Sequence, residues 1–239
     1  MIYKEKFKIG LKDVGKFNKI KNRAILECLE DIGGYHSDLA GYGVNEIETT
    51  KLSWILLDWK LEVKNRPTYG DELNIHTWAR GINKFFTYRD YEIYNQKGEI
   101  CAIATSKWVL INITNGKLAR ITEEIIEKYN PEDKKIFPGE LEKINIPDVF
   151  DSTIDYKVIR KDIDINKHMH NLYYLDLAYE ALPEDIYEQR PFNNVRIIYK
   201  KEIKLGDEIH CKYAKEDNKN IVVIKSSDDS VVHAVIELY

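Results

Sequence analysis

Four polar side chains in the last third of the chain have residue types suited to acid–base chemistry. Asp164, Asn166 and His168 occur at every second position, so in an extended segment they would point to one side. Histidine is the side chain whose charge changes near neutral pH. Glu202 follows in a strand-like stretch, where a carboxylate could orient the histidine or activate water. The set predicts a site that moves protons.

The segment around these residues supports the same prediction. A helix is expected to begin at Asn171, and the N–H groups at a helix start, here near residues 169–171, favour a developing oxyanion. Each residue also has a structural explanation. Asp164 and Asn166 are residue types that cap turns, His168 could be an ordinary surface histidine, and Glu202 could be a solvated charge among lysines.

Alternation of apolar and polar residues dominates the elements that must position this set. The pattern predicts β-strands over the runs 54–64, 73–77, 84–94, 99–112, 194–203, 207–215, 220–226 and 231–239. Helical periodicity appears over 22–33 and 171–182, with a short helix over 122–129. Residues 131–149 are rich in proline and charge and are predicted to link domains 1–130 and 150–239.

The two halves resemble each other. KDVGKFNKIKN (12–22) aligns with KDIDINKHMHN (161–171) at an offset of 149 residues. The stretch from Trp59 aligns without a gap with the stretch from Val195, and the Gly-Asp-Glu turns at 70–72 and 206–208 coincide. A long helix and several antiparallel strands, repeated, predict an α+β tandem hot-dog fold, in which each half wraps a curved sheet around its helix.

The repeat provides an internal control for the four polar residues. Asp164 aligns with Gly15, Asn166 with Phe17, His168 with Lys19 and Glu202 with Arg66. The segments around these positions otherwise keep the same pattern. Side chains that one copy lacks are not required by the shared fold. We therefore predict one catalytic domain, the C-terminal one, and an N-terminal domain that is catalytically degenerate and holds the substrate.

Composition excludes several classes. The 239 residues carry 36 Lys and Arg against 40 Asp and Glu, which gives a net charge of −4 and argues against a nucleic-acid-binding protein. The 44% hydrophobic content argues against disorder. Apolar runs reach about five residues, far short of the ~20 that span a bilayer, and no secretory signal is visible. Three scattered cysteines form no zinc or disulfide pattern, so a cytoplasmic protein without metal or cofactor is expected.

Two segments resemble a known family. DIDINKHMHNLYY (162–174) is similar to the DxDxNxHxNNxxY segment of the acyl–acyl carrier protein thioesterases of plants and bacteria, and IIYKKEIKLGD (197–207) resembles their YRRE strand. The resemblance implies that Asp164, Asn166, His168 and Glu202 hydrolyse an acyl thioester to a free fatty acid and end chain elongation. Ile203 stands where plant members often have cysteine, and His170 replaces the first asparagine of the pair that ends at Asn171. A bacterial-type member is implied.

The same resemblance implies an acyl chain and an acidic carrier protein as partners. We expect the acyl chain to lie between the helix 22–33 and the sheet, in a slot lined by Ile25, Leu29, Tyr42, Trp54 and Leu56. Asn171 is also expected to contact the substrate. The carrier is expected to meet two basic clusters, Lys16, Lys19, Lys21 and Arg23, and Lys200, Lys201 and Lys204. Any of these could equally be core residues or solvated charges.

Alternatives remain at this point. An acyl-CoA thioesterase differs only in the carrier, a hot-dog hydratase or dehydratase uses a similar histidine and carboxylate, and a non-enzymatic regulator would only bind the thioester. The sequence does not say which carboxylate acts as base or as nucleophile, which acyl chain is preferred, or whether the protein is a monomer or a homodimer.

Overall fold

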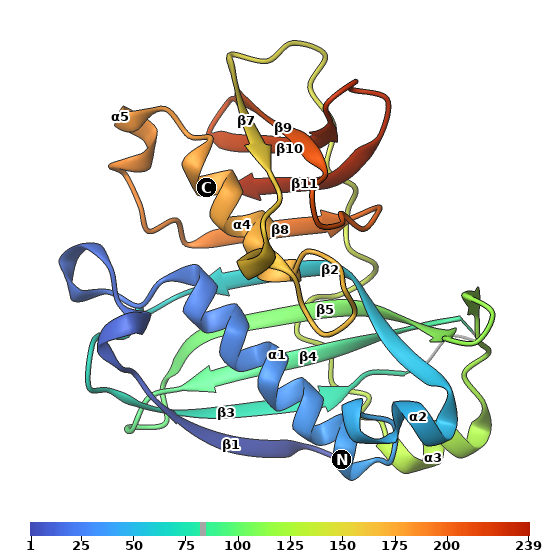
Figure 1. Cartoon of the computed structure of the whole chain (residues 1–239). Helices are drawn as coiled ribbons and strands as arrows, with labels where there is room; N and C mark the ends of the chain where they lie inside the picture. Colours follow the sequence, from blue (N-terminus) through green and yellow to red (C-terminus); the bar gives the residue numbers. More distant parts are fainter. Residues whose placement is uncertain (82–84) are drawn as a thin grey trace. The chain divides into compact units, whose positions relative to one another are not determined.

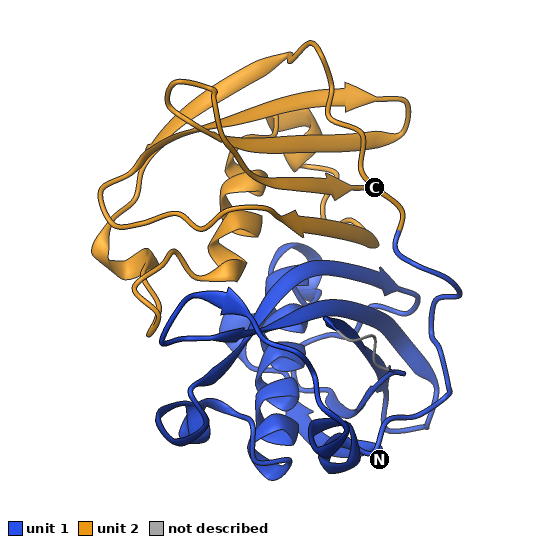
Figure 2. Ribbon diagram, turned by 90° about the vertical axis from the view of Figure 1, so that its right-hand side faces the viewer, with its two compact units in different colours: residues 1–141 blue, residues 142–239 orange. Residues whose placement is uncertain are grey.

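The computed structural model describes residues 1–81 and 85–239 and divides into two compact units, Met1–Leu141 and Glu142–Tyr239 (Figure 2). The boundary falls inside the segment 131–149, for which a linker was predicted. Within each unit a helix lies against one antiparallel sheet (Figure 1).

The sheet of unit 1 contains five main strands, which pair in the order β1-β3-β4-β5-β2. Helix α1 (Asn22–Leu39) packs on this sheet and buries Ile25, Leu26, Leu29 and Ile32. Short elements complete the unit: α2 (Ile47–Thr50), β6 (Lys117–Leu118), which pairs with β5, and α3 (Glu123–Tyr129), where a helix was predicted. The main strands are β1 (Tyr3–Lys8), β2 (Leu52–Val63), β3 (Glu72–Ala79), β4 (Phe86–Tyr94) and β5 (Ile100–Asn112). Residue 84, with which one predicted strand began, lies outside the described residues.

Unit 2 repeats this arrangement, with strands paired in the order β7-β9-β10-β11-β8. Its helix α4 (Asn171–Glu180) begins at the predicted residue, and α5 (Glu184–Tyr187) follows. The strands are β7 (Ser152–Lys157), β8 (Asn194–Tyr199), β9 (Glu208–Glu216), β10 (Lys219–Ser226) and β11 (Val232–Leu238).

The two units share register as well as strand order. Tyr3 pairs with Thr77 in unit 1, and Ser152 pairs with Tyr213, the residues at the aligned positions, in unit 2. The turns also match. The N–H group of Gly70 donates to Ile9 and that of Gly206 donates to Val158, each over 3.0 Å, and both glycines have a φ of +87°. The duplication inferred from the sequence is therefore a duplication of backbone hydrogen bonds.

Helix α1 extends six residues beyond the predicted end at residue 33. The Gly33-Gly34 pair resembles a helix stop, but Gly33 lies inside the helix where the sheet approaches closely. A Cβ atom there would lie 3.1 Å from Tyr91 Oη and 3.3 Å from Arg89 Cδ. Close packing against these two side chains, rather than the end of a helix, explains the glycine at position 33.

The first part of the predicted linker is held by unit 1. Lys134 Nζ lies 2.7 Å from the Glu92 carboxylate, and the N–H group of Ile136 donates to Asp90 over 3.0 Å. Arg80 donates to the carbonyl of Phe137 over 3.0 Å. These contacts make residues 134–137 a part of unit 1 rather than a free connection.

Among residues 1–81 and 85–239, no helix is both long and apolar enough to cross a membrane.

Candidate active site

The segment that carries Asp164, Asn166 and His168 is a tight turn, and the prediction of an extended segment is wrong. The N–H group of Asp164 donates to the carbonyl of His168 over 2.8 Å, and that of Lys167 donates to Asp164 over 3.1 Å. Asp164 Oδ1 accepts from the N–H groups of Asn166 (2.8 Å) and His168 (3.2 Å). Aspartate side chains favour such local bonds to the backbone, and this one folds the segment onto itself.

Asp162, the first acidic residue of the motif, anchors this turn to the rest of unit 2. It is 1% exposed, and its carboxylate accepts from the N–H group of Ile159 (2.9 Å) and from Tyr156 Oη (2.7 Å). Burial and then this carboxylate raise the pKa of Tyr156 to about 12. The sequence analysis gave Asp162 no role, although its partner in the repeat, Asp13, is also acidic and buried.

The start of α4 lies beside the turn, but two of its N–H groups are already used. Met169 donates to the carbonyl of Ile203 and His170 to that of Asp162, both over 2.8 Å. His170 Nδ1 in turn accepts from the N–H group of Leu172 over 3.2 Å and caps the helix. The expectation that N–H groups near residues 169–171 receive an oxyanion is therefore wrong for residues 169 and 170, because both N–H groups already have carbonyl acceptors.

Glu202 lies beyond the strand in which it was predicted. Strand β8 ends at Tyr199, because Lys200 and Lys201 both direct their N–H groups to the single carbonyl of His233 (2.8 and 3.2 Å). Glu202 is exposed in the segment that follows. That segment nevertheless returns to the turn of residues 164–168, since a backbone β-bridge joins Lys204 to His168. Within the described residues, no hydrogen bond joins the side chains of the four predicted catalytic residues.

Tyr174 is a polar residue of this region that the sequence analysis did not select. It lies on the first turns of α4, is 3% exposed, and packs edge-to-face on Tyr199 with 5.4 Å between ring centroids. Burial raises the pKa of Tyr174; a hydrogen bond to the backbone of Ile203 opposes this rise, and the charges of Glu202 and Asp164 add to it. Its hydroxyl is thus within electrostatic reach of both carboxylates. The available signal was the final tyrosine of the segment 162–174, where unit 1 has Ile25.

The residues predicted to hold an acyl chain fall into separate groups. Ile25, Leu29 and Leu56 are core residues of unit 1, with exposed fractions of 2%, 0% and 4%. Tyr42 and Trp54 are half-buried and meet at Tyr129 of α3, to which Trp54 Nε1 donates over 2.8 Å. Asn171 belongs to unit 2 and begins α4.

The two basic clusters differ in how free their side chains are. Lys200, Lys201 and Lys204 are exposed, and within the described residues they form no ion pair. In the first cluster, Lys21 is exposed, whereas Lys16, Lys19 and Arg23 are half-buried. Lys19 Nζ donates to the carbonyl of Arg66 over 3.4 Å.

The three cysteines are buried, and none belongs to the segments 162–174 and 197–207. Cys28, Cys101 and Cys211 are free and buried, and burial raises the pKa of each thiol, in Cys211 to about 12. A neutral, buried thiol is a poor nucleophile. Among the described residues, no group of three or more His, Cys, Asp or Glu side chains could hold a metal ion.

Comparison with protein families identifies the class. Residues 1–129 match the model of the acyl-ACP thioesterase N-terminal domain, and residues 148–237 match that of the C-terminal domain. The chain belongs to the acyl-ACP thioesterase family.

Individual relatives agree with this assignment. Over 222 residues the chain is 27% identical to the chloroplastic oleoyl-acyl carrier protein thioesterase 1 of Arabidopsis thaliana, covering 86% of this chain and 61% of that protein. It is 24% identical to the palmitoyl-acyl carrier protein thioesterase of Cuphea hookeriana, covering 84% of this chain and 52% of the relative. The chain thus spans less than two thirds of the length of these curated relatives.

Solved structures confirm the fold. An acyl-ACP thioesterase from Bacteroides thetaiotaomicron has a TM-score of 0.88 at 20% identity, over 99% of this chain and 96% of that one. The 12:0-ACP thioesterase from Umbellularia californica has a TM-score of 0.86, with the same identity and coverage. The prediction of a tandem hot-dog fold is confirmed.

Proposed function

We propose that this protein hydrolyses the thioester between a fatty acyl group and acyl carrier protein, and thereby ends chain elongation. Family membership supports the reaction class. The observation that carries the proposal is the difference between two turns of one backbone. Residues 164–168 and 15–19 share two backbone hydrogen bonds, yet Asp164, Asn166 and His168 stand where unit 1 has Gly15, Phe17 and Lys19.

The reaction needs a nucleophile and a proton carrier, and the turn in unit 2 offers both. Asp164, Asn166, His168 and Glu202 form the proposed catalytic set. Water that loses a proton to His168 or to a carboxylate adds to the thioester carbonyl. The C–S bond then breaks, and the carrier thiolate takes up a proton. Direct attack by a carboxylate is the alternative route, and Asn166 would orient the water or the carbonyl oxygen.

Asp164 also has a second task in this scheme. Its Oδ1 already holds the turn closed through two backbone N–H groups. Only its other oxygen, Oδ2, is without a hydrogen bond among the described residues, and we assign any contact with water or substrate to this atom. Positioned acid–base groups of this kind contribute roughly 10²–10⁴-fold to a rate.

The substrate contacts remain part of the proposal. We propose that unit 1 holds the acyl chain near Tyr42 and Trp54. Burial of the acyl chain there would contribute about 0.8 kcal/mol of binding energy per methylene. Ile25, Leu29 and Leu56, which belong to the buried core of the same unit, remain proposed neighbours of the acyl chain. Three buried free thiols suit a reducing compartment, so the cytoplasm stays the expected location.

The test is an assay of the purified chain with acyl carrier protein thioesters of graded length. Release of free thiol together with free fatty acid is expected. His168→Ala and Asn166→Ala should each lower turnover by at least ~10², while Phe17→Ala, at the position aligned with Asn166, should not. Hydrolysis of acyl-CoA alone would identify an acyl-CoA thioesterase. A change in double-bond absorbance without thiol release would identify a hydratase or dehydratase, and binding without turnover a regulator.

A further inference from the structure

Three exposed apolar side chains surround the turn that carries the proposed catalytic residues. Ile165 is 74% exposed, Leu205 54% and Ile159 46%. Scattered apolar side chains are normal on a surface, but backbone bonds bring these three segments together. Gly206 donates to the carbonyl of Val158, which places the turn of Leu205 beside Ile159. A backbone β-bridge joins Lys204 to His168, the last residue of the turn that carries Ile165.

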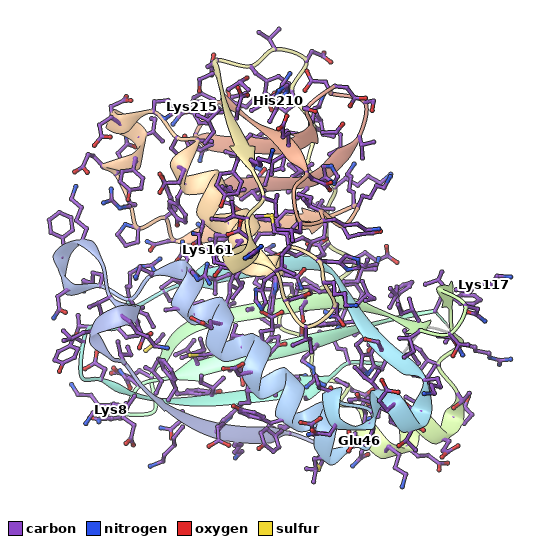
Figure 3. The ribbon with its side chains drawn as sticks, in the orientation of Figure 1. Lys8, Glu46, Lys117, Lys161, His210 and Lys215 are labelled. Carbon is purple, nitrogen blue, oxygen red and sulfur yellow. The ribbon has the colours of Figure 1, made fainter. Side chains whose placement is uncertain are left out.

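Exposed lysines lie on the same segments as these apolar side chains. Lys167, Lys200, Lys201 and Lys204 are all exposed, and none forms an ion pair within the described part of the chain. Lys161, labelled in Figure 3, stands at the beginning of the same segment, 3.8 Å from the buried carboxylate of Asp162. A surface with an apolar centre and unpaired cations around it fits a partner with the opposite pattern, an apolar side chain among carboxylates. We call it the basic–apolar surface: Ile159, Ile165, Leu205, Lys167, Lys200, Lys201 and Lys204.

The corresponding surface of unit 1 is also apolar and carries fewer lysines at the aligned positions. Leu11, Phe17 and Tyr69 are 76%, 73% and 50% exposed, and Tyr69 aligns with Leu205. Asn18, Asn65 and Thr68 align with Lys167, Lys201 and Lys204 and are neutral. Lys64 aligns with Lys200 and is also basic, but it lies 3.9 Å from the Glu62 carboxylate, and Lys16 Nζ lies 5.1 Å from the centre of the Phe17 ring. The two surfaces therefore differ in the number of unpaired lysines rather than in the presence of charge.

We propose that the basic–apolar surface docks the carrier protein itself, independently of the acyl chain. This inference rests on the proposed function and assigns the carrier to the second basic cluster together with an apolar contact. Ile165 lies between Asp164 and Asn166 in the turn, so a partner seated on Ile165 delivers its thioester arm to the catalytic residues. The occupant is a small acidic protein that presents an apolar side chain between its carboxylates.

The experiment compares one acyl group on two carriers, acyl carrier protein and pantetheine. Leu205→Ser should raise KM for the protein substrate about tenfold and leave kcat/KM for acyl-pantetheine within twofold. Tyr69→Ser, the aligned change in unit 1, should alter neither. Lys200→Glu with Lys204→Glu should raise KM for the protein substrate and flatten its dependence on salt, because screened charges mainly speed encounter.

Each other outcome overturns the proposal in a recognisable way. Equal losses on both substrates would mean that Leu205 and the lysines serve the catalytic turn. An unchanged KM for the protein substrate would mean that the carrier docks elsewhere. A dimer that Leu205→Ser dissociates, with KM unchanged, would make the surface an interface between copies of this chain. Failure of the proposed function is distinct, since the unmodified protein would then hydrolyse neither substrate.

Discussion

Residues 12–22 and 161–171 share several backbone hydrogen bonds and differ in their side chains. In both, an aspartate carboxylate accepts an N–H group three residues earlier, Gly10 to Asp13 over 2.7 Å and Ile159 to Asp162 over 2.9 Å. In both, the turn closes between its first and fifth residues, over 2.9 Å in unit 1 and 2.8 Å in unit 2. These hydrogen bonds thus form without Asp, Asn and His at the aligned positions, so the fold does not require the side chains that we propose to be catalytic.

One polar residue also changes the turn itself. In unit 2 the Asp164 carboxylate binds the N–H group of Asn166, and only Lys167 of the turn has a positive φ, +63°. In unit 1, where Gly15 offers no carboxylate, both Phe17 and Asn18 have a positive φ, +59° and +57°. Asp164 therefore has two effects: it places a carboxylate in the turn, and it keeps Asn166 out of the left-handed region.

The largest expected effect comes from giving the second turn the residues of the first. His168→Lys and Asp164→Gly should each lower turnover by at least ~10², since unit 1 shows that the frame accepts both residue types. Circular dichroism and thermal unfolding would establish that each variant is folded. The matched control, Gly15→Asp, puts a carboxylate into unit 1 and should leave turnover unchanged. Near-normal turnover in a folded His168→Lys variant would show that the histidine is not part of the catalytic set.

Glu202 and Arg66, which occupy aligned positions, are predicted to differ in role. Arg66 Nη1 donates to the Ile20 carbonyl (2.9 Å) and to Asn22 Oδ1 (2.8 Å), so it holds the start of α1. Arg66→Gln should cost about 1.5–3 kcal/mol of stability, the range for hydrogen bonds to charged groups, with little change in turnover. Glu202→Gln should do the reverse, with turnover ~10² lower and the unfolding midpoint unchanged, because Glu202 is exposed. Parallel effects of the two variants on stability would assign both positions to structure.

What the sequence predicted and what it missed follow from the range of the interactions involved. The strands and the start of α4 were predicted because period-2 patterning and an ungapped repeat are local signals. The conformation of residues 164–168 was not, since it depends on a side chain that bonds its own backbone. The end of β8 was missed for a similar reason, because it depends on one carbonyl of β11, at His233, that accepts two N–H groups.

The two central helices differ in length, and the difference encloses a buried polar pair in unit 1. Helix α1 has 18 residues and α4 has 10. The additional turns place His36, which is 0% exposed, 2.8 Å from Arg89 Nη1. Burial first, then the Arg89 charge, lowers the pKa of His36 to about 3. The histidine is therefore neutral, and its Nδ1 is the acceptor for a buried cation.

This pair predicts a pH dependence of stability that comes from unit 1. Above a pH of about 6.5, His36 is neutral in both the folded and unfolded states, and its contribution is complete. As the pH falls from 6.5 towards 3, His36 binds a proton in the unfolded state but not in the folded state. Stability should then drop by up to about 1.4 kcal/mol per pH unit. Denaturation by urea between pH 7 and 4.5 should show a shallower slope for His36→Gln than for the unmodified protein. Equal slopes would contradict the assignment.

The smallest expected effect tests the strain in the first turn. Phe17 holds a left-handed conformation, φ +59° and ψ +26°, while its ring is 73% exposed, so little packing compensates. Left-handed backbone costs an ordinary residue roughly 1–2 kcal/mol, whereas glycine adopts it freely but loses more entropy on folding. Phe17→Gly should therefore stabilise the protein by about 0.5–1 kcal/mol, measured by urea denaturation. Asn18→Gly should gain less, because asparagine tolerates this conformation. Asn166→Gly is the control, because Asn166 does not have a left-handed backbone, and it should not stabilise the protein. A gain in stability equal to that of Phe17→Gly would mean that the Asp164 carboxylate does not shape the turn.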